Sequence, residues 1–382
     1  MEYKRLGDYI KEVNVRNKDL KVTNLQGVSI SKQFIPSIAN TIGTDMSTYK
    51  VVRPGQFAYG PVTSRNGDKV SIALYKGNED ALISQAYTVF EVVDSEQVSS
   101  EYLMMWFQRP EFDRYARFHS HGSAREIFDW DELCGVYLPL PDIDRQREIV
   151  EEYETLSRRI RLNEQMIEKL EATAQALYRK MFVDNIDTEN LPEGWRMGTL
   201  GDICMINPKL SLKINTAAPF FDMDSLPTRG FFIDKVRYRE LGSGMKFQND
   251  DVLFARITPC MENGKAAIIS DLGNEETAFG STEFIVLRGR HQKLTSILAT
   301  LVRNEDFREY AKKQMKGTDG RQRVEASALS LYEMVIPGNS ILADIENDLS
   351  KLYIDMHLKT KENSKLSELQ SLLLAKMGNL KQ

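Results

Sequence analysis

The sequence is poor in the residues and runs that mark secreted, zinc-binding or membrane-spanning proteins. Its 382 residues include three cysteines, Cys134, Cys204 and Cys260, which are far apart and form no CxxC pair. This supports neither a disulfide framework nor a zinc site, and His119 and His121 lack further ligands at suitable spacing, so no metal site is predicted. The N-terminal stretch is charged where a signal peptide would be apolar, and no run approaches the roughly 18 apolar residues of a membrane span. We expect a cytoplasmic protein without a membrane partner.

Motifs of nucleotide chemistry and hydrolysis are also missing. The segment "LGSGMKF" at 241–247 holds a GxG without the third glycine, and the sequence contains no GxxxxGK[ST] phosphate loop. The segment "INPK" at 206–209 lacks the second proline and the aromatic residue of an amino-methyltransferase box. Neither a GxSxG elbow nor an HExxH helix occurs. The chain is therefore predicted to be non-catalytic and to hold no cofactor of its own.

Composition fits an ordinary folded protein with more than one domain. Hydrophobic residues make up 42% and charged residues 27%, and the net charge of -5 argues against indiscriminate coating of nucleic acid. The charge is uneven, because residues 1–76 hold 12 Lys and Arg against 6 Asp and Glu. This basic stretch fits either a solvated domain face or a surface that meets phosphates, and charge alone leaves both open.

Four short phrases recur in the same order along the chain. They are "RLGDYI" with "TLGDIC", Asn66-Gly67 with Asn263-Gly264, "EFDRYAR" at 111–117 with "DFREYAK" at 306–312, and "GSAREIFDWDELCGVYLP" from Gly122 with "GRQRVEASALSLYEMVIP" from Gly320. The offsets run from 194 to 198, and the last pair aligns Arg125 with Arg323, Leu133 with Leu331 and Pro139 with Pro337. Such a long period indicates an internal duplication into paired domains.

Two long helices with apolar seams are predicted, one after each repeat. Residues 142–182 contain neither Gly nor Pro, and apolar residues step by three and four, with Asn163 as the single polar interruption. The residues assigned to packing between the helices are Ile149, Leu156, Ile160, Ile167, Leu170 and Leu177 in the first helix, and Ile345, Leu349, Leu352, Met356, Leu366 and Leu373 in the second. Two matched seams in one chain favour an antiparallel coiled coil with each other, and an intermolecular dimer is the alternative.

The predicted fold class is α+β, with two similar globular domains separated by these antiparallel helices. Each domain holds short β-rich runs, such as "KVSIALY" and "AYTVFEVV" in the first and "DDVLFARI" and "TEFIVLRG" in the second, which predict twisted sheets. Helices are expected at 101–118, with a break at Pro110, and at 294–316. The predicted boundaries are 1–141 for the first domain, 142–182 for the central helix, 183–338 for the second domain and 339–382 for the C-terminal helix.

Polar loops at matching places in the two repeats are the candidate DNA contacts. Arg can pair with guanine, Asn and Gln with adenine, Glu with the amino group of cytosine, and Lys with phosphate. The candidates are Arg65, Asn66, Lys69, Ser123 and Arg125 in the first repeat, and Arg256, Glu262, Asn263, Lys265, Arg321, Gln322 and Arg323 in the second. The alternative is that Arg125 and Arg323 make ordinary surface ion pairs.

The order and spacing of these features resemble the specificity subunit of type I restriction-modification systems. The features that carry the resemblance are "YLPLPDIDRQREIVEEYETLSRRI", where a proline-ended strand leads into a helix, and the preceding loop "GSAREIFDWDEL". The second copy, "MVIPGNSILADIENDLSKL", lacks the second proline and the Arg-Gln-Arg run. The resemblance implies two target recognition domains, each of which reads one half of an asymmetric bipartite target in double-stranded DNA.

The resemblance also implies that the long helices set the distance between half-sites and dock two modification subunits, which restriction subunits with translocase activity join. S-adenosylmethionine, ATP and magnesium would then be bound by these partners. Two other functions remain open, a coiled-coil adaptor that binds proteins through its duplicated domains and a DNA enzyme with an unrecognised active site.

Overall fold

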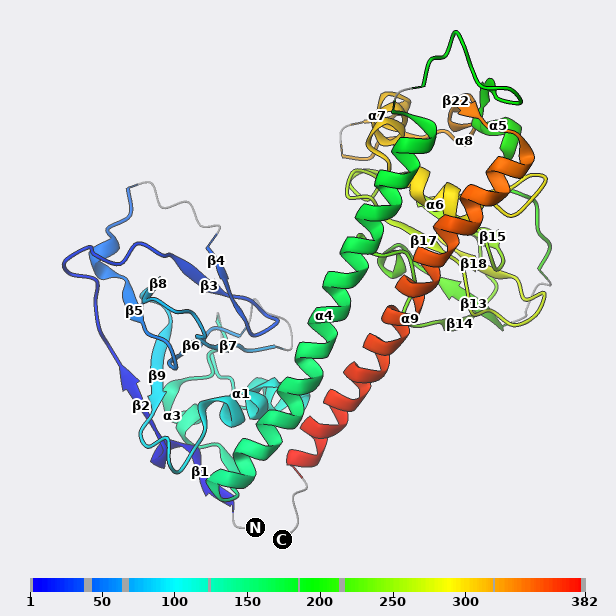
Figure 1. Ribbon diagram of the computed structural model, residues 1–382. Helices are drawn as coiled ribbons and strands as arrows, with labels where there is room; N and C mark the ends of the chain where they lie inside the picture. The colour runs from blue at the N-terminus through cyan, green and yellow to red at the C-terminus, as the bar shows by residue number, and fades with distance from the viewer. Residues whose placement is uncertain are drawn as a thin grey trace. The chain divides into compact units, whose positions relative to one another are not determined.

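The architecture is described from a computed structural model, which covers residues 3–37, 43–63, 69–122, 125–184, 186–212, 217–318 and 320–378. The chain divides into two compact units, unit 1 with Met1–Arg158 and Leu366–Gln382, and unit 2 with Arg159–Lys365. The long helices α4 (Ile143–Phe182) and α9 (Asn339–Met377) each contribute residues to both units (Figure 1). The α+β class with two long helices is confirmed. The finer domain boundaries stay a prediction.

Unit 1 is built on an antiparallel four-stranded sheet. The order is β2 (Ile10–Val13), β9 (Thr88–Val92), β6 (Phe57–Gly60) and β7 (Ser71–Leu74). Smaller pairs are β1 (Tyr3–Arg5) with β10 (Tyr137–Pro139), β3 (Gln26–Val28) with β4 (Phe34–Pro36), and β5 (Lys50–Val52) with β8 (Ala81–Ile83). Its short helices are α1 (Ser100–Gln108), α2 (Pro110–Phe118) and α3 (Trp130–Cys134), with 3-10 turns η1 (Leu6–Asp8) and η2 (Met46–Thr48).

The central strands of unit 1 are held by aromatic packing. Phe57 of β6 and Phe90 of β9 stack with ring centroids 4.7 Å apart, and Phe107 of α1 meets both rings edge-on. All three side chains are fully buried. Pro110 stands at the first turn of α2, where its missing N–H costs nothing, so the predicted break between α1 and α2 is confirmed.

Unit 2 repeats the same sheet with the strand order β12 (Cys204–Ile206), β19 (Phe284–Gly289), β16 (Val252–Ala255) and β17 (Ala266–Ile268). A second sheet has the order β14 (Arg237–Glu240), β13 (Ala217–Phe221), β18 (Ala278–Gly280) and β15 (Met245–Phe247). Two-stranded pairs join β11 (Arg196–Thr199) to β22 (Glu333–Ile336) and β20 (Met315–Lys316) to β21 (Arg323–Val324). The short helices are α5 (Leu200–Ile203), α6 (Thr295–Arg303), α7 (Glu305–Lys313) and α8 (Ala326–Leu329), with η3 (Met223–Ser225).

The single helix predicted at 294–316 is wrong, because α6 and α7 are separate helices. Asn304 ends α6 with extended backbone, and its side chain accepts hydrogen bonds from the N–H groups of Asp306 and Phe307 at the start of α7. An asparagine that satisfies free N–H groups in this way is a strong helix start signal. Asn304 in unit 2 and Pro110 in unit 1 thus both mark the break between two consecutive helices, Asn304 by capping α7 and Pro110 by starting α2.

The repeat alignment around the last strand is also corrected. The N–H of Leu6 donates to the carbonyl of Val136, and the N–H of Leu200 donates to the carbonyl of Tyr332, both at 2.8 Å. These equivalent bonds set an offset of 196 in this region, two less than predicted. Leu133 accordingly matches Leu329, since both are 0% exposed. Leu331, the predicted match of Leu133, is 65% exposed. Burial thus fixes the register that letter matching missed.

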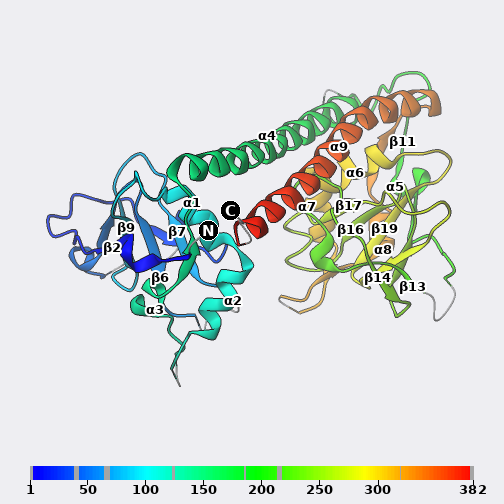
Figure 2. The same cartoon turned by 90° about the horizontal axis from the view of Figure 1, so that it is seen from below.

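Within unit 2, the parts of α4 and α9 that belong to it lie side by side and antiparallel (Figures 1 and 2). They enclose one apolar cluster with α6, to which Ala174 and Tyr178 contribute from α4 and Leu349 and Met356 from α9. Gln175 also donates a hydrogen bond to the carbonyl of Thr300 in α6 at 2.8 Å. The helix pair is therefore part of the core of this unit.

The apolar seam follows the predicted spacing at first and then turns. Tyr178 and Phe182 are 2% and 5% exposed, whereas Met181, which the spacing placed in the seam, is 36% exposed. An α-helix has 3.6 residues per turn, so a face defined by steps of three and four drifts along its length. Beyond Ala174 the buried face of α4 has moved by one position. In the described ranges, no helix is long and apolar enough to cross a membrane.

Candidate nucleic-acid interface

In unit 2, a backbone pairing brings two predicted DNA-contact loops together. The residues that follow β16 run antiparallel to β21, with a bridge between Ile257 and Arg323. The N–H of Thr258 donates to the carbonyl of Gln322 at 3.1 Å, and the N–H of Val324 donates to the carbonyl of Arg256 at 2.9 Å. Arg256 therefore stands next to Gln322 and Arg323, although it lies 66 and 67 positions before them in sequence.

The Asn-Gly turn follows directly and presents two more of the predicted residues. The N–H of Asn263 donates to the carbonyl of Pro259 at 3.0 Å, and Gly264 has a φ of +71°, as the turn prediction requires. Glu262 and Asn263 are exposed. Lys265 is already engaged, because its Nζ donates to the carbonyl of Met223 at 2.9 Å. The turn thus offers a carboxylate and an amide to a partner.

The arginines of this region differ in how firmly they are held. The Nε of Arg323 lies 2.9 Å from both carboxylate oxygens of Glu283, and its Nη2 lies 2.8 Å from Oε1. Its Nη1 donates to the carbonyl of Arg321 at 3.2 Å. Arg321 itself is exposed. The ion-pair alternative therefore applies to Arg323, but a guanidinium held by a carboxylate is also a fixed donor for a ligand.

Two polar atoms in the paired segment have no hydrogen-bond partner among the described residues. They are Nε of Arg256 and Oγ1 of Thr258, and both atoms are buried. Such orphaned groups are uncommon in folded proteins. Sequence reasoning missed Thr258 and Glu283, because nothing in their local pattern marks them before the pairing is known.

Unit 1 contains the same backbone pairing with different side chains. The N–H of Thr63 donates to the carbonyl of Glu126 and the N–H of Phe128 donates to the carbonyl of Pro61, both at 3.0 Å, around a bridge between Val62 and Ile127. By these bonds Glu126 corresponds to Gln322 and Ile127 to Arg323. The predicted equivalence of Arg125 with Arg323 is therefore wrong.

Arg125 corresponds instead to Arg321, and both are exposed. Lys69 is exposed as well. The other candidates of the first repeat, Arg65, Asn66 and Ser123, lie outside the described residues.

The residues assigned to helix packing differ in burial. Ile149, Ile167, Ile345, Leu349 and Met356 are buried, whereas Leu156, Ile160, Leu170, Leu177, Leu352, Leu366 and Leu373 are partly exposed. In unit 1, Ile149 of α4 shares an apolar cluster with Leu374 and Met377 of α9. The buried residue at this point of α9 is therefore Leu374, whereas the prediction was its neighbour Leu373.

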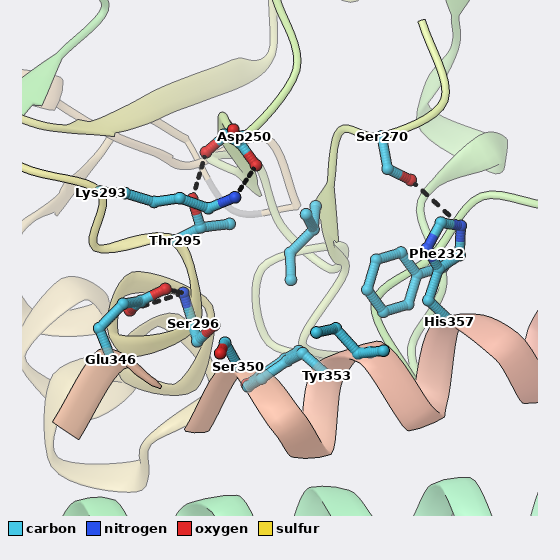
Figure 3. Close-up of a pocket in the computed structure, with 12 residues that line it drawn as sticks. Phe232, Asp250, Ser270, Lys293, Thr295, Ser296, Glu346, Ser350, Tyr353 and His357 are labelled. Carbon is cyan, nitrogen blue, oxygen red and sulfur yellow. Dashed lines mark hydrogen bonds and ion pairs between the residues drawn. The ribbon is translucent and has the colours of Figure 1, made fainter. Parts of the chain in front are cut away.

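A pocket of about 340 Å³ lies between α9 and the sheet of unit 2 (Figure 3). Its polar groups are already paired, since Lys293 lies 2.6 Å from Asp250 and Glu346 accepts hydrogen bonds from the N–H groups of Ser296 and Ile297. None of the described DNA-contact candidates lines it. The pocket therefore adds nothing to the interface.

The fold defines a class of chain with two α+β units built on the same antiparallel sheet, each packed against long helices. No protein-family model matches the sequence. The type I restriction enzyme EcoEI specificity subunit of Escherichia coli is 31% identical over 168 residues, which are 42% of this chain and 28% of that protein. The EcoAI specificity subunit of the same organism is 32% identical over 140 residues, 35% of this chain and 24% of that protein. The matches thus span about a quarter of the length of these relatives.

The type I restriction-modification system S subunit from M. genitalium shares the fold. Its crystal structure superposes with a TM-score of 0.58 at 12% sequence identity, covering 100% of this chain and 96% of that chain. The resemblance to type I specificity subunits that the sequence predicts is confirmed.

Proposed function

We propose that the chain is the DNA sequence-specificity subunit of a type I restriction-modification complex and has no catalytic activity itself. The observation that carries this proposal is the repeated loop pairing. One backbone arrangement presents Glu126 and Ile127 in unit 1 but Gln322 and Arg323 in unit 2. The two units share a backbone arrangement but carry different side chains on it. This suits recognition of two different base sequences, because side-chain hydrogen bonds to base edges specify sequence. An asymmetric bipartite target follows.

The partners of this function are double-stranded DNA, two modification subunits and restriction subunits with translocase activity. The modification subunits would bind S-adenosylmethionine, and the restriction subunits would use ATP and magnesium. The long helices would set the spacing of the half-sites and dock the modification subunits. A complex with this DNA substrate would act in the cytoplasm.

The test is coexpression of the chain with a type I modification subunit, followed by mapping of methylated sites in the host genome. Methylation at one bipartite sequence, and none with either protein alone, is expected. An Arg321→Ala complex should methylate this target roughly 5- to 150-fold more slowly, since a lost base or phosphate contact costs about 1–3 kcal/mol. The control is Arg237→Ala on β14, which removes another exposed arginine elsewhere in the unit.

Three outcomes separate the candidate functions. Methylation by the chain alone would show an unrecognised enzyme. Binding of partner proteins without sequence-dependent methylation would favour the adaptor. Equal loss of activity in the Arg321 and Arg237 variants would show that the paired loops are not the DNA interface.

A further inference from the structure

Arg303, at the C-terminal end of α6, contacts three separate segments of unit 2, which are residues 264–266, the loop at Pro227 and helix α4. Its Nε donates to the carbonyl of Gly264 at 3.1 Å, and its Nη2 donates to the carbonyls of Pro227 at 2.9 Å and Ala266 at 3.4 Å. Its Nη1 pairs with Oε1 of Glu171 on α4. One guanidinium therefore joins the long helix to the turn that presents Glu262 and Asn263.

The environment of this ion pair is enclosed and specific. The side chains of Arg303 and Glu171 are 6% and 19% exposed. The guanidinium carbon lies 3.9 Å from the ring centroid of Phe231, and the second oxygen of Glu171 accepts a hydrogen bond from the N–H of Gly230 at 3.0 Å. A charge-assisted hydrogen bond in such surroundings is strong and directional.

The loop that contains Gly230 is pressed directly against α4. Gly230 has a φ of +63°, and a Cβ atom there would lie 3.1 Å from a methyl group of Ile167. Residues 227–231 thus fill the space between α4, Arg303 and β17. The position of the Asn-Gly turn is therefore fixed relative to α4 through Arg303 and this loop.

The corresponding side chain in unit 1 is a glutamine and not an arginine. Helix α1 ends at Gln108 just as α6 ends at Arg303, and the Oε1 atom of Gln108 is buried with no hydrogen-bond partner in the described part of the chain. A glutamine cannot reproduce a five-donor guanidinium that pairs with a carboxylate. The last side chains of α1 and α6 therefore differ in how they are satisfied among the described residues.

We propose that Arg303 and Glu171 are positioning residues that hold the second DNA-reading turn in register with the long helix α4. The inference rests on the proposed function. Arg303 acts through the turn at Gly264 and does not itself contact DNA. Its carboxylate partner on α4 makes the placement of Glu262 and Asn263 depend on the helix that sets half-site spacing.

The experiment uses the purified complex of the full chain with a type I modification subunit. The substrates are unmethylated oligonucleotides that carry the target sequence found by methylation mapping. Arg303→Lys keeps the charge but cannot donate to Gly264, Pro227 and Glu171 together. Glu171→Gln can still accept from Gly230 and removes the charge. For both variants we expect discrimination against base changes in one half-site to fall roughly tenfold, the typical size of a single mismatch effect, with discrimination at the other half-site unchanged.

A matched control separates positioning from stability. Arg288 makes a two-point ion pair with the buried Asp251 in the same unit, with distances of 2.6 and 2.7 Å, and lies on β19. Arg288→Lys should lower the melting temperature as much as Arg303→Lys and leave discrimination at both half-sites intact. Equal loss at both half-sites, or loss in the Arg288 variant too, would overturn the proposal. Absence of sequence-specific methylation in the wild-type complex would instead refute the proposed function.

Discussion

Asn163 of α4 donates a hydrogen bond from its side-chain amide to Oδ1 of Asn363 on α9, at 2.9 Å. Asn163 is 3% exposed and stands in the apolar seam of the helix. Paired polar residues at such positions specify which helix positions meet, at some cost in stability. The pair therefore fixes the register of α4 against α9 within unit 2.

Replacing one member of this pair should be more harmful than replacing both. Asn163→Leu leaves the amide of Asn363 without its partner, and we expect a loss of about 1–3 kcal/mol in the free energy of unfolding. The double variant with Asn363→Leu should recover most of this loss, because two apolar side chains need no partner. Urea unfolding of the single and double variants measures the difference. A double variant as unstable as the single variant would contradict the assigned role.

The neighbouring ion pair predicts a stability change at acid pH. The hydrogen bond and charge of Arg159 lower the pKa of Glu362 from 4.5 to about 2. Because the folded-state pKa lies below the unfolded value, the stabilisation is present above about pH 4.5 and is lost as the pH falls towards 2. The side chains of Arg159 and Glu362 are 52% and 31% exposed. Solvent screening therefore limits the contribution of this ion pair to the free energy of unfolding to about 0.2–1 kcal/mol.

The measurement compares wild type with Glu362→Gln from pH 7 to pH 2. The wild type should be the more stable at pH 7, and the difference should vanish at the acid end. A difference that is constant across this range would mean that the carboxylate charge plays no part.

Glu346 should show the opposite dependence. Burial raises the pKa of its carboxyl above 4.5, although the N–H groups of Ser296 and Ile297 partly stabilise the charge. The folded state then favours the protonated form, so its stabilisation is complete below pH 4.5 and is lost as the pH rises through the folded-state pKa. Glu346→Gln cannot ionise and can still accept from Ser296. Relative to wild type, it should gain stability as the pH rises above 4.5, which thermal melting at several pH values would detect.

The sequence was sufficient for the broad architecture but not for the pairing that forms the interface. The length of α4, the central strands and the break at Pro110 follow from local composition and periodicity, and these predictions hold. The offset of the last strand does not, because matching of similar letters cannot distinguish Leu329 from Leu331, while burial can. Thr258, Glu283 and Arg303 acquire their significance from neighbours more than 20 positions away, so no local pattern could reveal them.

Removal of residues 341–382 should disrupt both units. Unit 2 would lose Leu342, Ile345, Leu349, Tyr353 and Met356 from its largest apolar cluster, and unit 1 would lose Leu374 and Met377 from its own. Each large buried side chain removed from a core costs about 2–5 kcal/mol, which together exceeds the usual stability of a domain. We expect no folded chain and no complex with a modification subunit. An intact, methylating complex from the truncated chain would contradict this, and circular dichroism of the truncated chain would measure the loss of folded structure.

The pairing of Arg323 with Glu283 predicts two distinguishable effects on DNA binding. Arg323→Ala removes a donor from the paired loops and should weaken binding to the methylated target roughly tenfold. Glu283→Gln removes a negative charge beside the interface and releases Arg323, so it should strengthen binding to unrelated DNA while lowering preference for the target. In the double variant the effect of Glu283→Gln on target preference should disappear, since the side chain that it positions is gone. Labelled target and unrelated duplexes are titrated into complexes of the modification subunit with the wild type and each of the three variants, at two salt concentrations, and the ratio of the two affinities gives the preference of each complex. Unchanged preference in both single variants would show that this ion pair is an ordinary surface contact.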